Sequence, residues 1–272
     1  MKSSEKISGW PLKLGVLSRP LVIAHRGDVE SAPENTLEAF RAAAEKGADG
    51  VELDVRLSMD GHVVVMHDRH VDRTTSGRGP VGRLTLAQLK ELDAGSWYDA
   101  RFNGARVPTL EEVLEEMPKG FLLDVELKVR GWGVMALASR VASVIKRHDR
   151  MDSTLVASFN PMALFAMRKL EPRIPRGYIW SAHHPYPISH RWLSPLAKAQ
   201  WMNPDHRTMT PRMLAHFHRH GKLALAWDQD MHESKGWPNP GIDGVVTDSV
   251  SAALRWRDGA ATPAPLRPDR SH

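Results

Sequence analysis

The chain has 272 residues, of which 42% are hydrophobic and 25% are charged, as in an ordinary globular protein. It contains no cysteine, which excludes disulfides, thiolate zinc sites, iron–sulfur clusters and a cysteine nucleophile. Its 37 basic and 32 acidic residues give a formal net charge of +5, without the long basic block that is typical of a nucleic-acid-binding tail. We therefore expect a small anionic molecule as partner, and no nucleic acid.

No stretch of about 18 apolar residues is present that could span a membrane. Residues 1–20 lack the apolar run of about 7–15 residues that a signal peptide needs. We therefore expect a cytoplasmic enzyme in which residues 1–20 form an N-terminal extension. The sequence leaves the oligomeric state open, and a homodimer is compatible with it.

Short apolar runs alternate with helical segments along the chain. The runs are rich in Val, Leu and Ile, as in strands that are buried on both faces of a parallel sheet. The nine candidate strands are residues 21–24, 51–56, 63–67, 121–127, 154–158, 177–180, 199–202, 223–227 and 244–247. This alternation over about 250 residues predicts an α/β fold that fills one (β/α)8 barrel. A barrel has eight strand places, so one candidate lies outside it, and the run at 199–202 is the weakest.

Several helices carry start signals in the sequence. Thr85 and Thr109 each begin a capping box, and Asn35 stands before the helical pattern at 37–46. No helix fits between the candidate strands 51–56 and 63–67, so we expect the barrel to be irregular there.

The predicted domain boundaries follow from composition. Residues 21–258 form the barrel, and the glycine-rich stretch at about 69–107 is an insertion after the third candidate strand. Residues 259–272 contain several prolines and are expected to be a disordered tail.

Three carboxylates occur where apolar residues are expected. Glu52 and Asp54 lie in one apolar run, two positions apart, so that both point to the same face of a strand. Glu126 repeats the pattern in another run, with Lys128 two positions later. Like charges on a buried face repel each other unless a metal ion or a cation balances them. Three carboxylates without cysteine favour Mg²⁺ or Ca²⁺, and a structural ion pair is the alternative.

Two histidines end apolar runs. His25 and His67 each follow a candidate strand, and the carboxyl ends of barrel strands build the active site. An imidazole changes its charge near neutral pH, which suits a general acid and a general base. Arg26 follows His25 and offers a planar fork for a phosphate. By contrast, His216, His218 and His220 resemble a metal cluster but lie where a helix ends, so we expect them to interact with the helix dipole.

These residues occur within an ordered set of motifs that resembles the glycerophosphodiester phosphodiesterase family over residues 21–255. The motifs are His25-Arg26-Gly27, Pro33-Glu34-Asn35-Thr36, Glu52-Leu53-Asp54, Asp60-Gly61, His67-Asp68, residues 72–77, 92–97 and 108–113, Glu126-Leu127-Lys128, Ser158-Phe159 and residues 244–248. Each motif alone is weak, whereas the ordered set is specific.

The resemblance implies a TIM barrel that cleaves glycerophosphodiesters to sn-glycerol 3-phosphate and an alcohol. It implies that Glu52, Asp54 and Glu126 hold one divalent cation, Mg²⁺ or Ca²⁺, and that His25 and His67 are the acid–base pair. Arg26 and Lys128 would bind the phosphate, and Trp227 would form a wall of the pocket. Apart from Trp227, these are the residues that the reading of the strands had already selected.

The sequence departs from the family pattern in two places. The late motif Trp-Thr-Val-Asn of the family is replaced by Trp227-Asp228-Gln229-Asp230, and residues 181–191 have no counterpart, so we expect them to shape the alcohol pocket. Three other functions stay open: a lysophospholipase D or sphingomyelinase D-like lipid hydrolase, a phosphate-binding protein without turnover, and nucleic-acid cleavage, for which only the pI of 9.5 speaks.

Overall fold

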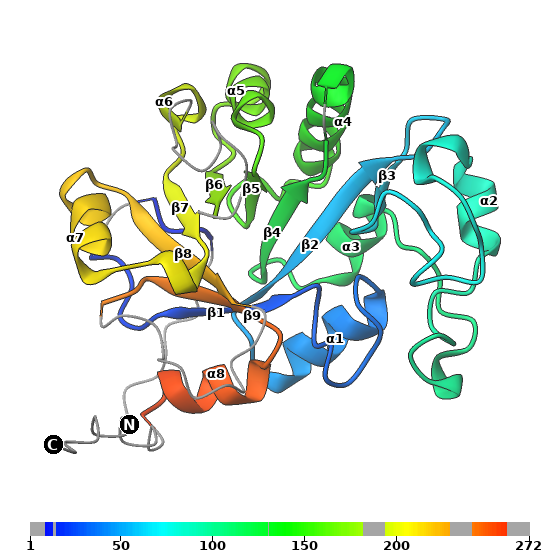
Figure 1. Cartoon of the computed structure of the whole chain (residues 1–272), viewed down its shortest axis with the longest axis horizontal. Helices are drawn as coiled ribbons and strands as arrows, with labels where there is room; N and C mark the ends of the chain where they lie inside the picture. Colours follow the sequence, from blue (N-terminus) through cyan, green and yellow to red (C-terminus); the bar gives the residue numbers. More distant parts are fainter. Residues whose placement is uncertain (1–8, 13–14, 130, 182–193, 229–240, 260–272) are drawn as a thin grey trace, which may run out of the picture.

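The centre of the molecule is a closed barrel of parallel strands with helices on its outside (Figure 1). The structure is a computed structural model that describes residues 9–12, 15–129, 131–181, 194–228 and 241–259. The strand order is β1-β9-β8-β7-β6-β5-β4-β2, and a parallel pairing of β1 with β2 closes the ring. The predicted (β/α)8 barrel is confirmed.

The elements follow one another in strand–helix alternation. The barrel strands are β1 (Leu21–His25), β2 (Gly50–Leu57), β4 (Leu122–Leu127), β5 (Thr154–Ser158), β6 (Arg176–Trp180), β7 (Trp201–Pro204), β8 (Leu223–Asp228) and β9 (Gly244–Thr247). The α-helices are α1 (Leu37–Lys46), α2 (Leu86–Glu91), α3 (Leu110–Glu116), α4 (Val134–Arg147), α5 (Pro161–Leu170), α6 (Ser194–Ala197), α7 (Pro211–Arg219) and α8 (Val250–Arg257). Short 3-10 helices are η1 (Val81–Arg83), η2 (Ala100–Phe102), η3 (Gly131–Gly133) and η4 (His206–Thr208). The weakest predicted strand, 199–202, forms a barrel strand two residues later, as β7.

The surplus strand is β3 (Val63–Val65), which pairs antiparallel with β2 and does not belong to the ring. A tight turn precedes it, in which Gly61 has a φ of 83°, a left-handed conformation that glycine adopts without steric cost. The candidate strand 63–67 was therefore too long, because the ladder to β2 ends at Val65. The hairpin explains why the chain offered nine strands for eight places.

Residues 69–107 lie between β3 and α3 and contain η1, α2 and η2. This segment has its own apolar cluster beside the barrel, formed by Val64, Met66, Val71, Val81, Leu89, Ala94 and Val107. Its loops are organised by Asp93, whose carboxylate accepts hydrogen bonds from the backbone N–H groups of Gly95, Ser96 and Gly104 at 2.6–2.9 Å. These hydrogen bonds lower the pKa of the Asp93 carboxyl to about 2.

Helix starts follow the predictions with one exception. Both capping boxes are present, at Thr85 and Thr109. Helix α1, however, is capped by Thr36 rather than by Asn35, since the Thr36 side chain accepts from the backbone N–H of Ala39. Asn35 is used elsewhere: its side-chain amide donates to Asp54 Oδ2 at 2.8 Å.

The amino-terminal end of the barrel is closed by Trp10. This side chain is 4% exposed, and its indole N–H donates to the Leu123 carbonyl of β4 at 3.1 Å. Its ring meets Trp201 of β7 edge to face, with centroids 5.3 Å apart. Trp10 of the predicted extension thus packs into the barrel, whereas residues 1–8, 13–14 and 260–272 lie outside the described residues. Within the described ranges, every helix is too short or too polar to cross a membrane.

Candidate active site

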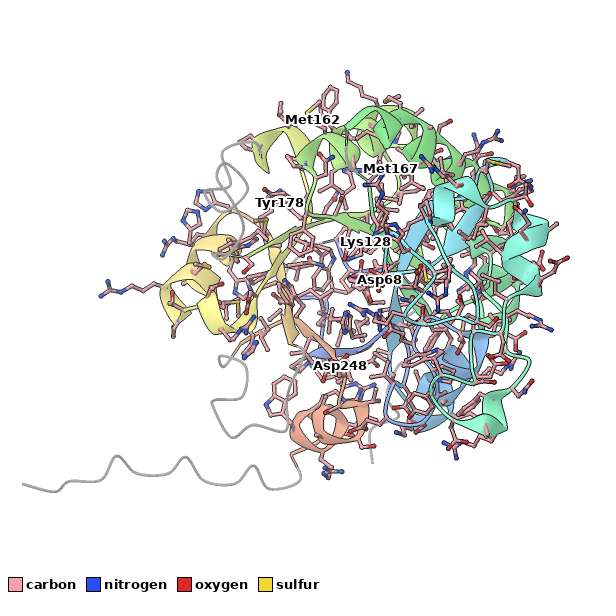
Figure 2. The ribbon with its side chains drawn as sticks, turned by 45° about the vertical axis from the view of Figure 1, so that its right-hand side comes forward. Asp68, Lys128, Met162, Met167, Tyr178 and Asp248 are labelled. Atoms are coloured by element: carbon pink, nitrogen blue, oxygen red, sulfur yellow. The ribbon has the colours of Figure 1, made fainter. Side chains whose placement is uncertain are left out.

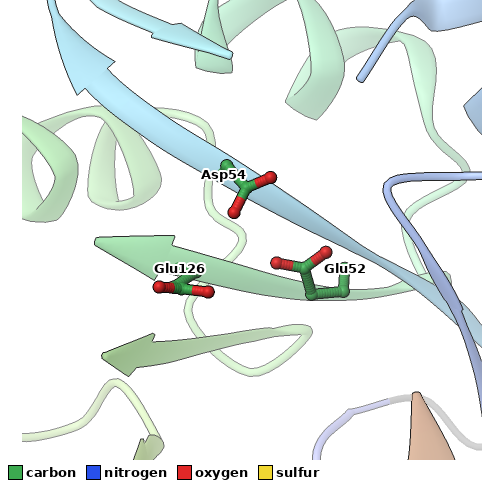
Figure 3. A group of neighbouring side chains, drawn as sticks. All are labelled: Glu52, Asp54 and Glu126. Atoms are coloured by element: carbon green, nitrogen blue, oxygen red, sulfur yellow. The ribbon is translucent and has the colours of Figure 1, made fainter. Parts of the chain in front are cut away.

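The three carboxylates predicted to share an ion lie together inside the barrel. Glu52 and Asp54 extend from β2, and Glu126 extends from β4, where it is the register partner of Asp54 (Figure 3). All three side chains are buried, and one oxygen of each lies within 4.8 Å of the others. They are the only group of three potential metal ligands found among the described residues. The sequence therefore identified a real spatial cluster.

The charges of this cluster are unequally balanced. Burial raises the pKa of the Glu52 carboxyl well above its ordinary value, and repulsion from Asp54 and Glu126 raises it further. Burial also acts on Asp54, but the positive charges of Lys128 and Arg26 outweigh it and lower the pKa of that carboxyl. The Lys128 ammonium lies 2.8 Å from Glu126 Oε2 and 3.1 Å from Asp54 Oδ1. One cationic side chain thus serves two carboxylates, and Glu52 is left the least compensated.

The donor set suits a hard divalent cation. All three ligands are carboxylates, which Mg²⁺ and Ca²⁺ prefer. Asp54 Oδ1 is buried and accepts no hydrogen bond in the structure, although Lys128 lies near it. A dication between Glu52, Asp54 and Glu126 would relieve the repulsion that raises the pKa of Glu52. The site therefore fits a metal ion of this class, and its identity is open between the two.

His25 stands at the end of β1, next to the carboxylate cluster. Its Nδ1 lies 2.6 Å from Asp248 Oδ1, and its Nε2 lies 3.9 Å from Glu52 Oε2. A carboxylate only accepts hydrogen bonds, so Nδ1 carries the proton in this pair. The imidazole consequently presents Nε2 toward Glu52.

His67 reaches the same site by a different route from the one predicted. The sequence placed it at the carboxyl end of a parallel strand, but β3 runs antiparallel to β2 and ends at Val65. The returning chain runs back along β2, where the Met66 N–H donates to the Asp54 carbonyl at 2.8 Å. This brings the next residue, His67, to the level of the carboxylates.

The second imidazole is oriented as the first one is. His67 Nδ1 lies 2.6 Å from Asp68 Oδ1, so it donates to that carboxylate. Burial lowers the pKa of the His67 imidazole; Asp54 opposes the shift, and the cations Lys128 and Arg26 add to it. Asp68, Lys128 and Asp248, from three separate segments, lie around the middle of the barrel end in Figure 2.

Arg26 is held in place by its backbone and by three carboxylates. Its φ of 57° is unusual for a residue other than glycine, and its backbone N–H donates to Glu52 Oε2 at 3.2 Å. The guanidinium donates to Glu34 Oε1 at 2.9 Å and lies 3.4 Å from Asp54 Oδ2. The atom of Arg26 that faces Asp54 is Nε, which is buried and makes no hydrogen bond of good geometry with any described residue. The predicted phosphate-binding residue thus borders the carboxylate cluster.

Aromatic side chains form another side of the site. Trp227 is half-buried on β8, and its ring meets Phe159 edge to face with centroids 6.1 Å apart. The indole Nε1 is buried and has no hydrogen-bond partner among the residues that the structure describes. Gln229, Asp230 and residues 182–191, to which the sequence analysis gave a part in the pocket, lie outside the described residues.

Several site residues were missed by the sequence reasoning. Asp248 and Asp68 orient the two histidines, and both had been noticed only as members of motifs. Glu34 and Arg73 form ion pairs beside them, and these two residues had likewise been noticed only as members of motifs. The His216–His220 segment behaves as expected for a structural element, since His218 binds Asp243 at 2.8 Å.

Comparison with known proteins agrees with the motifs. The sequence model of the glycerophosphoryl diester phosphodiesterase family matches residues 25–252. A glycerophosphodiester phosphodiesterase of Caldanaerobacter subterraneus is 36% identical over 240 residues, which are 87% of this chain and 97% of the relative. An enzyme of the same name from Bacillus subtilis is 31% identical over 85% of this chain and 84% of its own length.

Solved structures show the same similarity. A phosphodiesterase of Oleispira antarctica, in complex with the product sn-glycerol-3-phosphate, is 34% identical with a TM-score of 0.77, over 87% of this chain and 97% of that one. A glycerophosphodiester phosphodiesterase of Agrobacterium tumefaciens is 27% identical with a TM-score of 0.70, over 86% and 99% of the two chains. The chain described here therefore belongs to the glycerophosphoryl diester phosphodiesterase family, and it is a phosphoric diester hydrolase.

Proposed function

We propose that this enzyme hydrolyses glycerophosphodiesters to sn-glycerol 3-phosphate and an alcohol, with one divalent cation and two histidines. The observation that carries the proposal is the pair of imidazoles, each bound through Nδ1 to an aspartate, next to a buried cluster of three carboxylates. Family membership supports the reaction class, and the product found in the Oleispira antarctica structure supports the glycerol phosphate half of the substrate.

Glu52, Asp54 and Glu126 would hold the cation. When bound, a dication there supplies charge stabilisation for the phosphoryl oxygens as the P–O bond breaks. The side chains of Arg26 and Lys128 border the same space, so their donors would bind the remaining phosphate oxygens. Trp227 and Phe159 would pack against the carbon atoms of the substrate.

The two histidines divide the proton transfers. Since Asp248 and Asp68 hold the Nδ1 protons, each imidazole works through Nε2. One imidazole is neutral, and its Nε2 takes the proton from the attacking hydroxyl. The other is protonated on both nitrogens, and its Nε2 gives a proton to the leaving alkoxide. The attacking group in this scheme is a hydroxyl of the substrate glycerol, which yields a cyclic phosphate that water then opens.

The test offers glycerophosphocholine, glycerophosphoethanolamine, lysophosphatidylcholine and a bis-p-nitrophenyl ester, each with and without EDTA. We expect glycerol 3-phosphate from the first two substrates and loss of the reaction with chelator. General acid–base help is worth about 10²–10⁴-fold, so His25→Ala and His67→Ala should each lose at least about 10²-fold in kcat while remaining folded. A near-normal kcat in either variant, or full activity after chelation, contradicts the proposal.

A lysophospholipase D activity is the second candidate, and one observation favours it. Met135, Met162 and Leu196 are 39–55% exposed, although they are large apolar side chains. They lie near the starts of three consecutive helices, α4, α5 and α6, on the face where the barrel strands end (Figure 2 shows Met162). The acyl chain of a lysophospholipid could pack there. Release of lysophosphatidic acid from lysophosphatidylcholine, at a rate comparable to that of glycerol 3-phosphate from glycerophosphocholine, would support this candidate.

A further inference from the structure

Arg73, a residue of the insertion, connects two carboxylates at the rim of the site. Its Nε donates to Asp68 Oδ2 at 2.7 Å, and its two terminal nitrogens donate to Glu34 Oε2 at 2.7 Å and Oε1 at 2.8 Å. Three of its five N–H donors are thus used in the planar geometry that only a guanidinium offers. Its side chain is 46% exposed, whereas that of Glu34 is only 14% exposed.

Each of these carboxylates also holds a residue of the proposed machinery. Asp68 uses its other oxygen for His67 Nδ1 at 2.6 Å, and Glu34 accepts from the Arg26 guanidinium at 2.9 Å. The result is a chain of alternating charge that runs from Arg26 through Glu34, Arg73 and Asp68 to His67. It joins the loop after β1, the residue pair after β3 and the insertion.

The network differs from an ordinary surface ion pair. Isolated exposed pairs contribute little to stability, because water screens them and long side chains lose freedom. Here burial raises the pKa of the Glu34 carboxyl, but the hydrogen bonds of Arg73 and the charge of Arg26 more than reverse the effect. Burial also raises the pKa of the Asp68 carboxyl, but the hydrogen bonds and charges of Arg73 and His67 together outweigh it and lower that pKa to about 2. The carboxylates of Glu34 and Asp68 therefore stay anionic and hydrogen-bonded near neutral pH.

We propose that Arg73 is a positioning residue that fixes the His67–Asp68 pair by anchoring Asp68 to Glu34. The inference rests on the proposed role of His67 in the reaction. Asp68 is 30% exposed and directly follows the histidine, so without Arg73 its carboxylate can turn toward water and release the imidazole. A displacement of about 1 Å at a reacting group can cost about 10²-fold in rate.

The experiment compares Arg73→Ala and Arg73→Lys with wild type on glycerophosphocholine. We expect kcat to fall about 10–100-fold in both variants, because lysine keeps the charge but not the fork, while KM changes less than about threefold. Methylguanidinium added to Arg73→Ala should restore part of kcat, since the site is open to solvent, and it should have no effect on Arg73→Lys. A wild-type kcat in Arg73→Lys, or loss without rescue in Arg73→Ala, overturns the inference.

Arg106 provides the matched control. It lies in the same insertion and is exposed, and it donates to the carbonyls of Glu91 and Leu92 without a contact to the site. Arg106→Ala should keep wild-type kcat and be indifferent to methylguanidinium. If Arg106→Ala loses as much kcat as Arg73→Ala does, the effect is one of folding in the insertion, and the positioning role is wrong.

Glu34 gives a second, independent readout. Because Glu34 also holds Arg26, Glu34→Gln should raise KM for the phosphodiester as well as lower kcat, unlike the Arg73 variants. An unchanged KM and kcat in Glu34→Gln contradicts the network. Failure of the proposed function looks different: wild type would then release no glycerol 3-phosphate, or His67→Ala would remain active. A wild type that is active and an inactive His67→Ala, together with an unaffected Arg73→Ala, reject this inference alone.

Discussion

His25 and Asp248 lie 223 positions apart in the chain, yet His25 Nδ1 is 2.6 Å from Asp248 Oδ1. They meet because β1 and β9 are neighbours in the barrel, with Ala24 in register with Thr247. His25 ends β1, and Asp248 directly follows β9. The two residues therefore meet only because the first and last strands of the barrel pair with each other.

Replacing Asp248 by asparagine should impair the reaction without disturbing the fold. The asparagine side chain keeps the shape but can present an N–H to Nδ1, which favours the wrong imidazole tautomer. We expect kcat to fall about 10²–10⁴-fold, measured by release of glycerol 3-phosphate. Asp258→Asn, at an exposed aspartate after α8, should keep wild-type activity; equal losses in the two variants would show that the pairing with His25 is unimportant.

Binding of Mg²⁺ or Ca²⁺ should stabilise the wild-type protein. At a free cation concentration of about 100 times Kd, binding stabilises the folded protein by about 2.7 kcal/mol. This corresponds to a rise of roughly 5–10 °C in Tm, measured when the cation is added to EDTA-treated protein. Glu52→Gln should lose most of this rise. Without metal it should be at least as stable as wild type, because it removes a carboxyl whose pKa is raised by burial and by nearby like charges.

Glu45→Gln is the control for this metal test, since Glu45 is exposed on α1. Its Tm should respond to the cation as that of wild type does. A Tm rise in Glu52→Gln equal to that of wild type would mean that the ion binds elsewhere.

Trp10→Ala should destabilise the barrel without changing the chemistry. The substitution leaves a cavity against Trp201 and removes the hydrogen bond to the Leu123 carbonyl, and large aromatic truncations of this kind cost about 3–5 kcal/mol. Urea unfolding measures this loss. Leu12→Ala, at a side chain that is 47% exposed, should change stability by less than about 0.5 kcal/mol. Since Trp10 closes the end of the barrel opposite the site, kcat of the folded variant should stay normal.

Asp93 makes the stability of the insertion depend on pH. Its folded pKa of about 2 lies below the unfolded value of about 4, so its contribution is complete above about pH 4 and is lost as the pH falls toward 2. Asp93→Ala should therefore open the insertion to proteolysis at neutral pH much faster than wild type. The difference in amide-exchange protection between the two proteins should shrink between about pH 4 and pH 2. A difference that is independent of pH would show that the ionised carboxylate plays no part.

The cluster of Glu52, Asp54 and Glu126 was predictable because it depends on the local spacing of these residues. The i, i+2 pattern of Glu52 and Asp54 in an apolar run places both on one face of β2 whatever the rest of the chain does. Glu126 could be added because β4 shows the same anomaly, and the register of Asp54 with Glu126 then brings the two strands together. Carboxylates within apolar runs repel one another once they are buried, and such runs can be recognised in the sequence.

The second histidine lies near the carboxylates, as predicted, but not for the reason that the sequence suggested. His67 was assigned to the end of a parallel strand, whereas an antiparallel hairpin returns it to the level of Asp54. Asn35 shows the reverse case: its sequence position favoured a helix cap, but tertiary structure used its amide to bind Asp54. In both places, contacts within the assembled barrel set the position of the side chain, and the local sequence pattern did not.

The strand–helix alternation, the buried carboxylates and the two histidines at the ends of apolar runs could be predicted from hydrophobic spacing and residue type. Three features became visible only in the folded chain: which aspartate orients each imidazole, which strand lies outside the ring, and the contact of Arg73 with both Glu34 and Asp68. The reason is physical: hydrogen bonds and ion pairs between distant segments are set by strand order and loop geometry. Periodicity along the chain does not encode them.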